Sequence, residues 1–335
     1  MAPYYSDIIL RPLRLAALLC LSAAACFPTA AVASSRVELY QTTVPVADRS
    51  DGAQSAAFQA ALKVVLIRIT GRRTADEDPA LAPLLRNARR YVQQYRGAPD
   101  NMLWVAFDGA ALERWLTQNG QPLWGRERPS TFVCLSVANG GGPGAIVTAD
   151  DASELKGAID AAAIQRGIPL IWPDAAERQR DRLDCSTSGS ADLARAHGAD
   201  AVLLGHASTA TAAASVHWTH VFLDHGSEFS GVLDGVNRAA DLYAGLYAAS
   251  GTLAPIDIEI IGVTNLKDYA SVQGYLDSLT FVAHVDVDAL DGDVVRFRLL
   301  TRGGAESLRH ALAGSGKLQS LPAGEDAVQR FQLRR

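Results

Sequence analysis

The feature that most constrains the fold is an alternation of strand-like and helix-like segments in the middle of the chain. Short apolar segments with strand character alternate there with longer segments whose apolar residues recur at helical spacing. The expected strands are residues 131–138, 146–148, 168–172, 201–207 and 216–223, and the expected helices are residues 153–166, 191–197 and 233–249. This order is typical of a layered α/β domain, which we place at residues 129–250.

A smaller α/β domain is expected before it, at residues 34–128. Its segments follow the order strand, helix, helix, strand and helix, at residues 37–46, 51–69, 78–95, 102–107 and 108–119. Gly71 suits the end of the first helix because glycine adopts positive φ without strain. The second helix would place Tyr91 and Tyr95 one turn apart on a shared face. Asp108 is a typical cap for the third helix.

The last part of the chain, residues 255–335, predicts a small β-α-β-β-α sandwich. A strand at 256–263 and a helix at 266–279 precede two strands at 281–290 and 294–300. Asp291-Gly292 between those strands is a strong two-residue hairpin signal. A last helix covers 306–312, and the residues beyond Gly324 are expected to be loosely held. The whole chain is therefore predicted to be of α/β (α+β) class, with three small layered units.

The first 33 residues have the pattern of a secretory signal peptide. Arg11 and Arg14 precede an apolar run from Leu15 to Phe27, and Ala31-Val32-Ala33 gives a small-x-small cleavage site. The run is shorter than the roughly 20 residues that span a bilayer. We expect cleavage near Ala33 and a periplasmic location, with no membrane-spanning segment in the mature chain. A retained N-terminal anchor and a lipoprotein are the alternatives.

Several patterns that would indicate a cofactor, a metal or a catalytic serine are incomplete. The glycines at 140–144 are followed by Ala145-Ile146, not by the Lys and Ser or Thr of a phosphate-binding loop. The acidic residues between Asp286 and Asp293 miss the spacing of a calcium loop. His217 and His220 fall on opposite faces of one expected strand. No Gly-x-Ser-x-Gly occurs. We therefore expect no cofactor and no metal.

Basic residues of the first domain are the most interesting polar feature. They are predicted to lie near the ends of its first two helices, and Arg128 with Trp124 occupies the connection to the middle domain. They could bind an anionic polymer, a lipid head group or an acidic partner, or they could simply form a solvated helical face. The net charge of −5 speaks against general nucleic-acid binding. The candidate binding residues are Arg68, Arg72, Arg73, Arg90, Trp124 and Arg128.

Two cysteines, Cys134 and Cys185, remain after removal of the leader. In an oxidising compartment they could form a disulfide. Cys134 lies in a strand-like segment, however, where a buried free thiol is equally expected. The sequence leaves the two interpretations open.

The motifs of the first domain resemble a bacterial family of unknown function, numbered 2066. The matching residues are Arg68-Ile69-Thr70-Gly71-Arg72-Arg73, Tyr91-Val92-Gln93-Gln94-Tyr95, Phe107-Asp108 and Leu123-Trp124-Gly125-Arg126-Glu127-Arg128-Pro129. The chain departs from that pattern at Gly97, where family members often carry an aromatic residue. The resemblance implies an exported proteobacterial protein without an established enzyme activity. It transfers no catalytic residue.

The middle domain is similar to α/β domains of periplasmic assembly factors, such as the N-terminal domain of the Tol-system propeller protein. Such similarity concerns the fold and does not fix the function. Together these observations favour a periplasmic binding or scaffold protein that contacts other envelope proteins over an enzyme. The alternatives are an envelope hydrolase acting on cell-wall polymers, and a small-molecule or glycan sensor with a cleft near Trp124.

Overall fold

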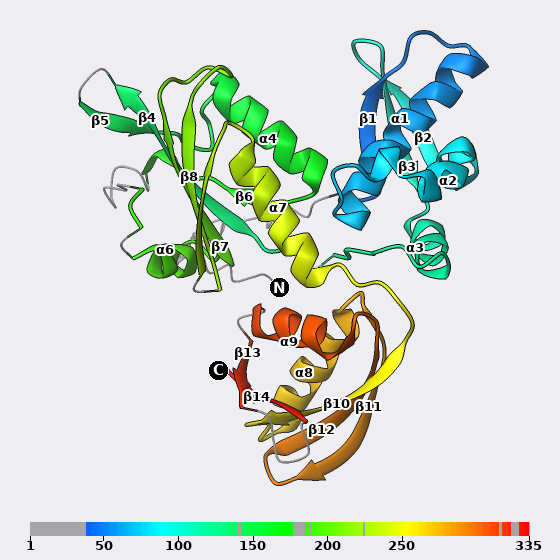
Figure 1. Cartoon of the computed structure of the whole chain (residues 1–335), viewed down its shortest axis with the longest axis vertical. Coiled ribbons are helices and arrows are strands. Elements are labelled where there is room, and N and C mark those ends of the chain that lie inside the picture. Colours follow the sequence, from blue (N-terminus) through cyan, green and yellow to red (C-terminus); the bar gives the residue numbers. More distant parts are fainter. Residues whose placement is uncertain are drawn as a thin grey trace, which may run out of the picture. The chain divides into compact units, whose positions relative to one another are not determined.

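The computed structural model describes residues 38–126, 128–139, 142–176, 185–187, 189–223, 225–314, 317–322 and 328–334. These residues form eight α-helices and three β-sheets, so the fold is of the α+β class (Figure 1). Residues Ser35–Arg335 group as one unit, apart from Met1–Ser34. The predicted leader lies outside the described residues, and the domain limits given above stay predictions.

The first sheet is antiparallel and has the strand order β1-β3-β2. Its strands are β1 (Gln41–Pro45), β3 (Met102–Phe107) and β2 (Val92–Ala98), and helix α1 (Asp51–Thr70) packs on one face. Ser50 caps α1, since its side chain accepts a hydrogen bond from the N–H of Ala53. Gly71 ends the helix with φ 73°. Asp108 caps α3 (Gly109–Gln118), as expected.

The prediction of a long second helix at residues 78–95 is wrong. The chain instead forms 3-10 turns and one short helix, and then enters a strand. Asn87 interrupts the helical path with φ −106° and ψ 26°. Tyr95 lies in β2 opposite Val105, so it shares no helical face with Tyr91. The elements are η1 (Ala75–Glu77), η2 (Pro79–Leu81), α2 (Ala82–Arg86) and η3 (Ala88–Tyr91).

The middle sheet has the order β5-β4-β7-β8-β9, and β6 pairs with β4. β4 is parallel to β6 and β7, whereas the other pairs are antiparallel. The hairpin partner β9 was not predicted. The strands are β4 (Thr131–Asn139), β5 (Gly142–Ile146), β6 (Leu170–Ile171), β7 (Ala201–Ala207), β8 (Val216–Phe222) and β9 (His225–Ser230).

Helices cover both faces of this sheet (Figure 1). Helices α4 (Glu154–Arg166) and α7 (Asp234–Tyr247) pack on each other and share a core with Val133, Leu135 and Leu203. Helix α6 (Ser190–Ala196) packs on β7. It covers the opposite side chains of the central strands, among them Phe132, Cys134, Val202 and Leu204. Both faces of the central strands are therefore buried, which explains their continuous apolar sequence.

The third sheet has the order β11-β12-β10-β14-β13. The predicted hairpin across Gly292 is present, but the expectation of a loosely held end is wrong for residues 328–334, the part beyond Gly324 that the structure describes. Strand β14 pairs in parallel with β10, and Phe331 is fully buried. The elements are β10 (Ala254–Ile261), α8 (Leu266–Ser278), β11 (Val282–Asp291), β12 (Val294–Thr301), α9 (Gly304–Gly314), β13 (Leu318–Leu321) and β14 (Gln329–Leu333).

Among the described residues, no helix combines the length and the apolar character that a bilayer span requires.

Candidate functional site

The predicted basic residues do not form one surface. Arg90 is exposed, and its side chain makes no hydrogen bond or ion pair with the described residues. Arg72 is half-buried, with Nη1 2.7 Å from a carboxylate oxygen of Asp78 and Nη2 donating to Gln121. Arg68 is buried in the interior. These arginines therefore serve different purposes, although they are close in sequence.

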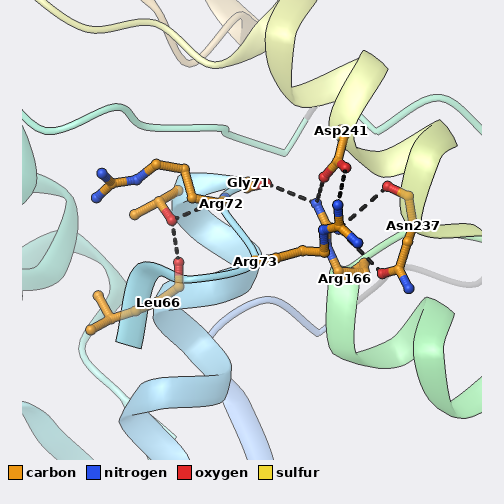
Figure 2. Close-up of polar contacts among 8 residues, drawn as sticks. Leu66, Gly71, Arg72, Arg73, Arg166, Asn237 and Asp241 are labelled. Carbon is orange, nitrogen blue, oxygen red and sulfur yellow. Dashed lines mark hydrogen bonds and ion pairs between the residues drawn. The ribbon is translucent and has the colours of Figure 1, made fainter. Parts of the chain in front are cut away.

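Arg73 belongs to a cluster around a second, buried arginine that sequence reasoning missed. Arg166, at the end of α4, donates from Nη2 to the carbonyl of Gly71 and to Asp241, both at 2.8 Å (Figure 2). Its Nη1 donates to Asn237 on α7. The other oxygen of Asp241 lies 3.1 Å from Nη2 of Arg73. One carboxylate thus pairs with two guanidinium groups and ties the end of α1 to α4 and α7.

Trp124 and Arg128 are also structural in their contacts. The ring of Trp124 is fully buried, and the backbone N–H of Trp124 donates to the carbonyl of Ile69. The guanidinium carbon of Arg128 lies 3.6 Å from the centre of that ring. Nη2 of Arg128 also donates to the carbonyl of Arg68. The ring of Trp124 is therefore not open to a ligand.

Arg68 differs from the other buried arginine because only carbonyl groups hold it. Nε donates to the carbonyl of Ile164 at 2.7 Å, and Nη1 donates to the carbonyls of Glu38 and Gln41 at 3.0 and 2.7 Å. Among the described residues, no carboxylate forms an ion pair with Arg68, and no acceptor contacts Nη2. Nη2 nevertheless remains accessible from outside the protein.

The position of Arg68 is favourable for a cation. It lies in the last turn of α1, where the carbonyl ends of the helix attract positive charge. Burial lowers the pKa of its guanidinium to about 10, which leaves the group charged at neutral pH. The side chain is only 3% exposed, so most of its charge is removed from water. A buried charge of this kind gains much from a paired anion.

A cavity of about 640 Å³ opens beside Arg68. It lies between β1 and the end of α4, and its volume is in the range of ligand-binding clefts. One wall is apolar, and the other consists of the polar edge of β1. The lining residues are Glu38, Gln41, Thr42, Thr43, Arg68, Trp104, Asp160, Ala163, Ile164, Ile168, Pro169 and Leu170.

Trp104 supplies the aromatic wall of the cavity. It lies opposite Thr43 on β1 and Arg96 on β2, so these three side chains share the sheet face that α1 does not cover. The guanidinium carbon of Arg96 lies 4.3 Å from the centre of the Trp104 ring. The alternation of Leu103, Trp104 and Val105 already predicts a strand with two different faces. The sequence does not indicate which partner the open face meets.

The acidic residues at the cavity leave the charge of Arg68 available. The Asp160 carboxylate accepts from Lys156 Nζ at 2.7 Å and from Trp172 Nε1 at 2.9 Å. Glu38 is exposed, and its contact with Arg68 is through its carbonyl. An anion that enters the cavity therefore meets a guanidinium that no carboxylate of the described residues already neutralises.

Within the part of the chain that the structure describes, no three His, Cys, Asp or Glu residues are grouped to hold a metal ion. His217 is exposed, whereas His220 is buried and bonds to Tyr243 at 2.9 Å. The two histidines point to opposite sides of β8, as the strand period predicts. The run Asp286–Asp293 lies in the β11–β12 hairpin.

Cys134 and Cys185 form a disulfide, with their Cα atoms 5.3 Å apart. Both residues are buried beneath α6, in the small core with Phe132 and Val202. The bond closes a separation of 51 residues. It constrains the middle sheet on the face away from α4 and α7.

Residues 33–125 match the model of a domain of unknown function, DUF8605. The family numbered 2066 is therefore not the one found, and that assignment is wrong. The motifs on which it rested are short, and several are explained by local structure, such as the α1 terminus at Gly71. No curated protein and no solved structure matches the chain.

The DUF8605 match includes the first sheet, α1 and Arg68, but ends before α4. The cavity takes its polar wall from the matched segment, and α4 with the residues that follow it supplies the opposite wall.

Proposed function

We propose that the chain is a binding protein of the bacterial cell envelope, and that Arg68 receives an anionic group of its ligand. The observation that carries this proposal is a buried guanidinium at a cavity, with one nitrogen unbonded and no ion-pair partner among the described residues. A carboxylate or a phosphate oxygen would satisfy that nitrogen through a charge-assisted hydrogen bond.

The envelope location rests on the leader-like segment at residues 1–33. The disulfide supports it, because such bonds persist in oxidising compartments. The direct test is N-terminal sequencing of the protein from fractionated cells of its host. A periplasmic form that begins near Ser34 is expected, and an unprocessed cytosolic form would contradict the location.

The anion site is tested by NMR with a simple probe, N-acetylglycine. Because Nε of Arg68 donates to a carbonyl, its hydrogen is protected from exchange and gives an observable signal. We expect that signal and the amide signals of Gln41 and Thr43 to shift and saturate as the probe is added. The backbone amide signal of Arg90, whose side chain is exposed and whose N–H donates to the carbonyl of Asn87, serves as the control for general binding of anions to exposed cations. Equal shifts at Arg90 and Arg68 would contradict the site, and inorganic phosphate in a second titration distinguishes the two anion classes.

Substitution of Ile164 provides a matched pair of charge variants. Ile164 lines the cavity and is 62% exposed, and Arg68 donates its hydrogen bond to the Ile164 backbone carbonyl. Ile164→Glu and Ile164→Lys remove the same apolar surface and leave that hydrogen bond in place. Coulomb attraction over about 8 Å in a largely aqueous medium predicts roughly tenfold tighter probe binding by the Lys variant than by the Glu variant. Equal affinities would contradict an anion site here.

A further inference from the structure

The outer edge of β1 is the feature that identifies the kind of ligand. β1 is the terminal strand of the sheet order β1-β3-β2, and no described strand pairs with its outer side. The cavity lies along that side, because Gln41, Thr42 and Thr43 all line it. An unpaired strand edge offers a row of donors and acceptors to another extended chain.

The register of β1 shows which backbone groups point outward. The N–H of Phe107 donates to the carbonyl of Tyr40, and the N–H of Val46 donates to the carbonyl of Asn101. Bonded and non-bonded pairs alternate in an antiparallel ladder. Thr42 and Val44 therefore bond to β3, like Tyr40 and Val46, while Gln41, Thr43 and Pro45 direct their backbone groups to the outer edge.

Two residues limit which outward groups are available. Pro45 has no N–H. Because its backbone faces the outer edge, pairing between β1 and β3 does not require that N–H. The carbonyl of Gln41 already accepts from Nη1 of Arg68 at 2.7 Å. The N–H and the carbonyl of Thr43 therefore form the central outward pair. They lie one outward position along β1 from Gln41, whose carbonyl Arg68 contacts.

The opposite wall of the cavity suits side chains of an extended segment. Ile164, Ile168 and Leu170 are apolar, and Trp104 adds an aromatic surface next to Thr43. Side chains of an added strand would alternate between this wall and solvent. Main-chain pairing supplies affinity in such complexes, and the pockets for alternate side chains supply specificity.

We propose that this cavity binds an extended peptide segment, which adds as a fourth strand to the outer edge of β1 and places a carboxylate on Nη2 of Arg68. The inference rests on the proposed anion site and adds the class of ligand to it. The five residues of β1 span about 17 Å at 3.4 Å per residue, so a segment of four or five residues matches the edge. The carboxylate belongs to an acidic side chain or to the C-terminus of the partner.

A pair of Thr43 variants tests the strand addition. Thr43→Pro removes the outward N–H and obstructs the edge, but it leaves the hydrogen bonds between β1 and β3 intact. Thr43→Ala loses the same side-chain polarity and keeps the N–H, so it is the control. Loss of a hydrogen bond together with obstruction of the edge predicts at least about tenfold weaker peptide binding by Thr43→Pro, and less than about threefold by Thr43→Ala.

The probe is a random heptapeptide library displayed with free C-termini, from which binders are resynthesised as acids and as C-terminal amides. Affinities are measured by fluorescence anisotropy on the full mature chain, and each variant is first checked for the N-acetylglycine response at Arg68. Amide hydrogen exchange on the unmodified protein gives a second reading. Exchange at Thr43 should slow when the peptide binds, whereas exchange at Thr42 should change little.

The outcomes separate the two proposals. Binding that falls with Thr43→Pro and with Ile164→Glu supports both. Binding that responds to Ile164→Glu but not to Thr43→Pro, with unchanged exchange at Thr43, overturns strand addition and keeps the anion site. A library that yields no binder also overturns strand addition, and the N-acetylglycine titration then decides the anion site alone. Weaker binding of the amide form identifies the C-terminus as the source of the carboxylate, and equal binding identifies an acidic side chain.

Discussion

Replacement of Gly71 by alanine should destabilise the protein through two separate effects. Gly71 ends α1 with φ 73°, and its N–H donates to the carbonyl of Ile67. A Cβ atom at this position would lie 2.3 Å from the Cβ of Ala244 on α7 and 3.1 Å from Cε3 of Trp124. Carbon atoms in contact normally stay about 3.5 to 4.0 Å apart. The added methyl group therefore forces α1 and α7 to separate.

The magnitude follows from the sum of the two effects. A side chain in the left-handed region costs about 1 to 2 kcal/mol. Overpacking of a tight interior contact costs about 1 to 3 kcal/mol. The free energy of unfolding should therefore fall by about 2 to 5 kcal/mol.

Two further variants separate the effects in urea denaturation followed by tryptophan fluorescence. Gly120 has φ 64° but no atom within 4 Å of the added Cβ, so Gly120→Ala should lose only the conformational part. Ala244→Gly costs about 1 kcal/mol alone, as a glycine inside a helix. It should nevertheless recover stability when combined with Gly71→Ala. Additive effects in the double variant, or equal losses at Gly71 and Gly120, would refute the proposed contact.

Three further predictions concern Asp241, His220 and the disulfide. Asp241→Asn leaves Arg166 without its carboxylate and should lower the free energy of unfolding by about 2 to 3 kcal/mol, as measured by urea denaturation. The loss is smaller than the roughly 3 to 5 kcal/mol expected for a fully buried pair, because the side chain of Asp241 is 35% exposed. Burial lowers the pKa of His220 from 6.5 to about 4, so the folded protein favours the neutral ring. The stability that the neutral buried ring contributes is fully present above pH 6.5 and is lost as the pH falls toward 4. The wild type should lose about 2 to 3 kcal/mol more than His220→Gln between pH 7 and 4.5. Reduction of the Cys134–Cys185 bond reopens a loop of 51 residues and should lower the free energy of unfolding by about 2 to 4 kcal/mol, which a Cys134→Ala/Cys185→Ala variant should reproduce without reductant.

The fold was predictable where apolar spacing and local turn chemistry agree. Residues 51–69 have helical spacing, a capping serine and a terminal glycine, and α1 covers that range. The turn at Asp291-Gly292 likewise fixed the β11–β12 hairpin. The middle α/β arrangement followed from alternating segments, because strands buried on both faces need a continuous apolar sequence.

The errors arose where pairing partners far apart in sequence decide the structure. Residues 92–98 contain Val92, Tyr95 and polar residues that fit a helix or an edge strand, and pairing with β3 selects the strand. β14 has a short, strongly polar sequence, and its place beside β10 becomes visible only in the sheet. Periodicity reports the face that a segment buries, and it does not report the segment's neighbour.

The arginines show the same limit at the candidate site. Arg68, Arg72 and Arg73 lie within six residues, and helical spacing alone cannot separate them. The partner of each comes from elsewhere in the chain: Asp78 for Arg72, and Asp241 for Arg73. Arg68 reaches three carbonyl groups but no carboxylate among the described residues. The useful distinction is therefore between a compensated and an uncompensated charge, which requires the tertiary structure.

That distinction also determines how the binding proposal can be tested fairly. Arg68 joins α1 to the start of β1 and to the end of α4, so its removal would disturb the walls of the cavity as well as the proposed ligand contact. A loss of binding in an Arg68 variant would consequently have two explanations. Ile164 accepts the hydrogen bond of Arg68 with its backbone carbonyl, and Thr43 bonds to β3 through neither of its backbone groups. Substitutions at these two positions change the charge and the strand edge separately, while the guanidinium keeps its three carbonyl partners.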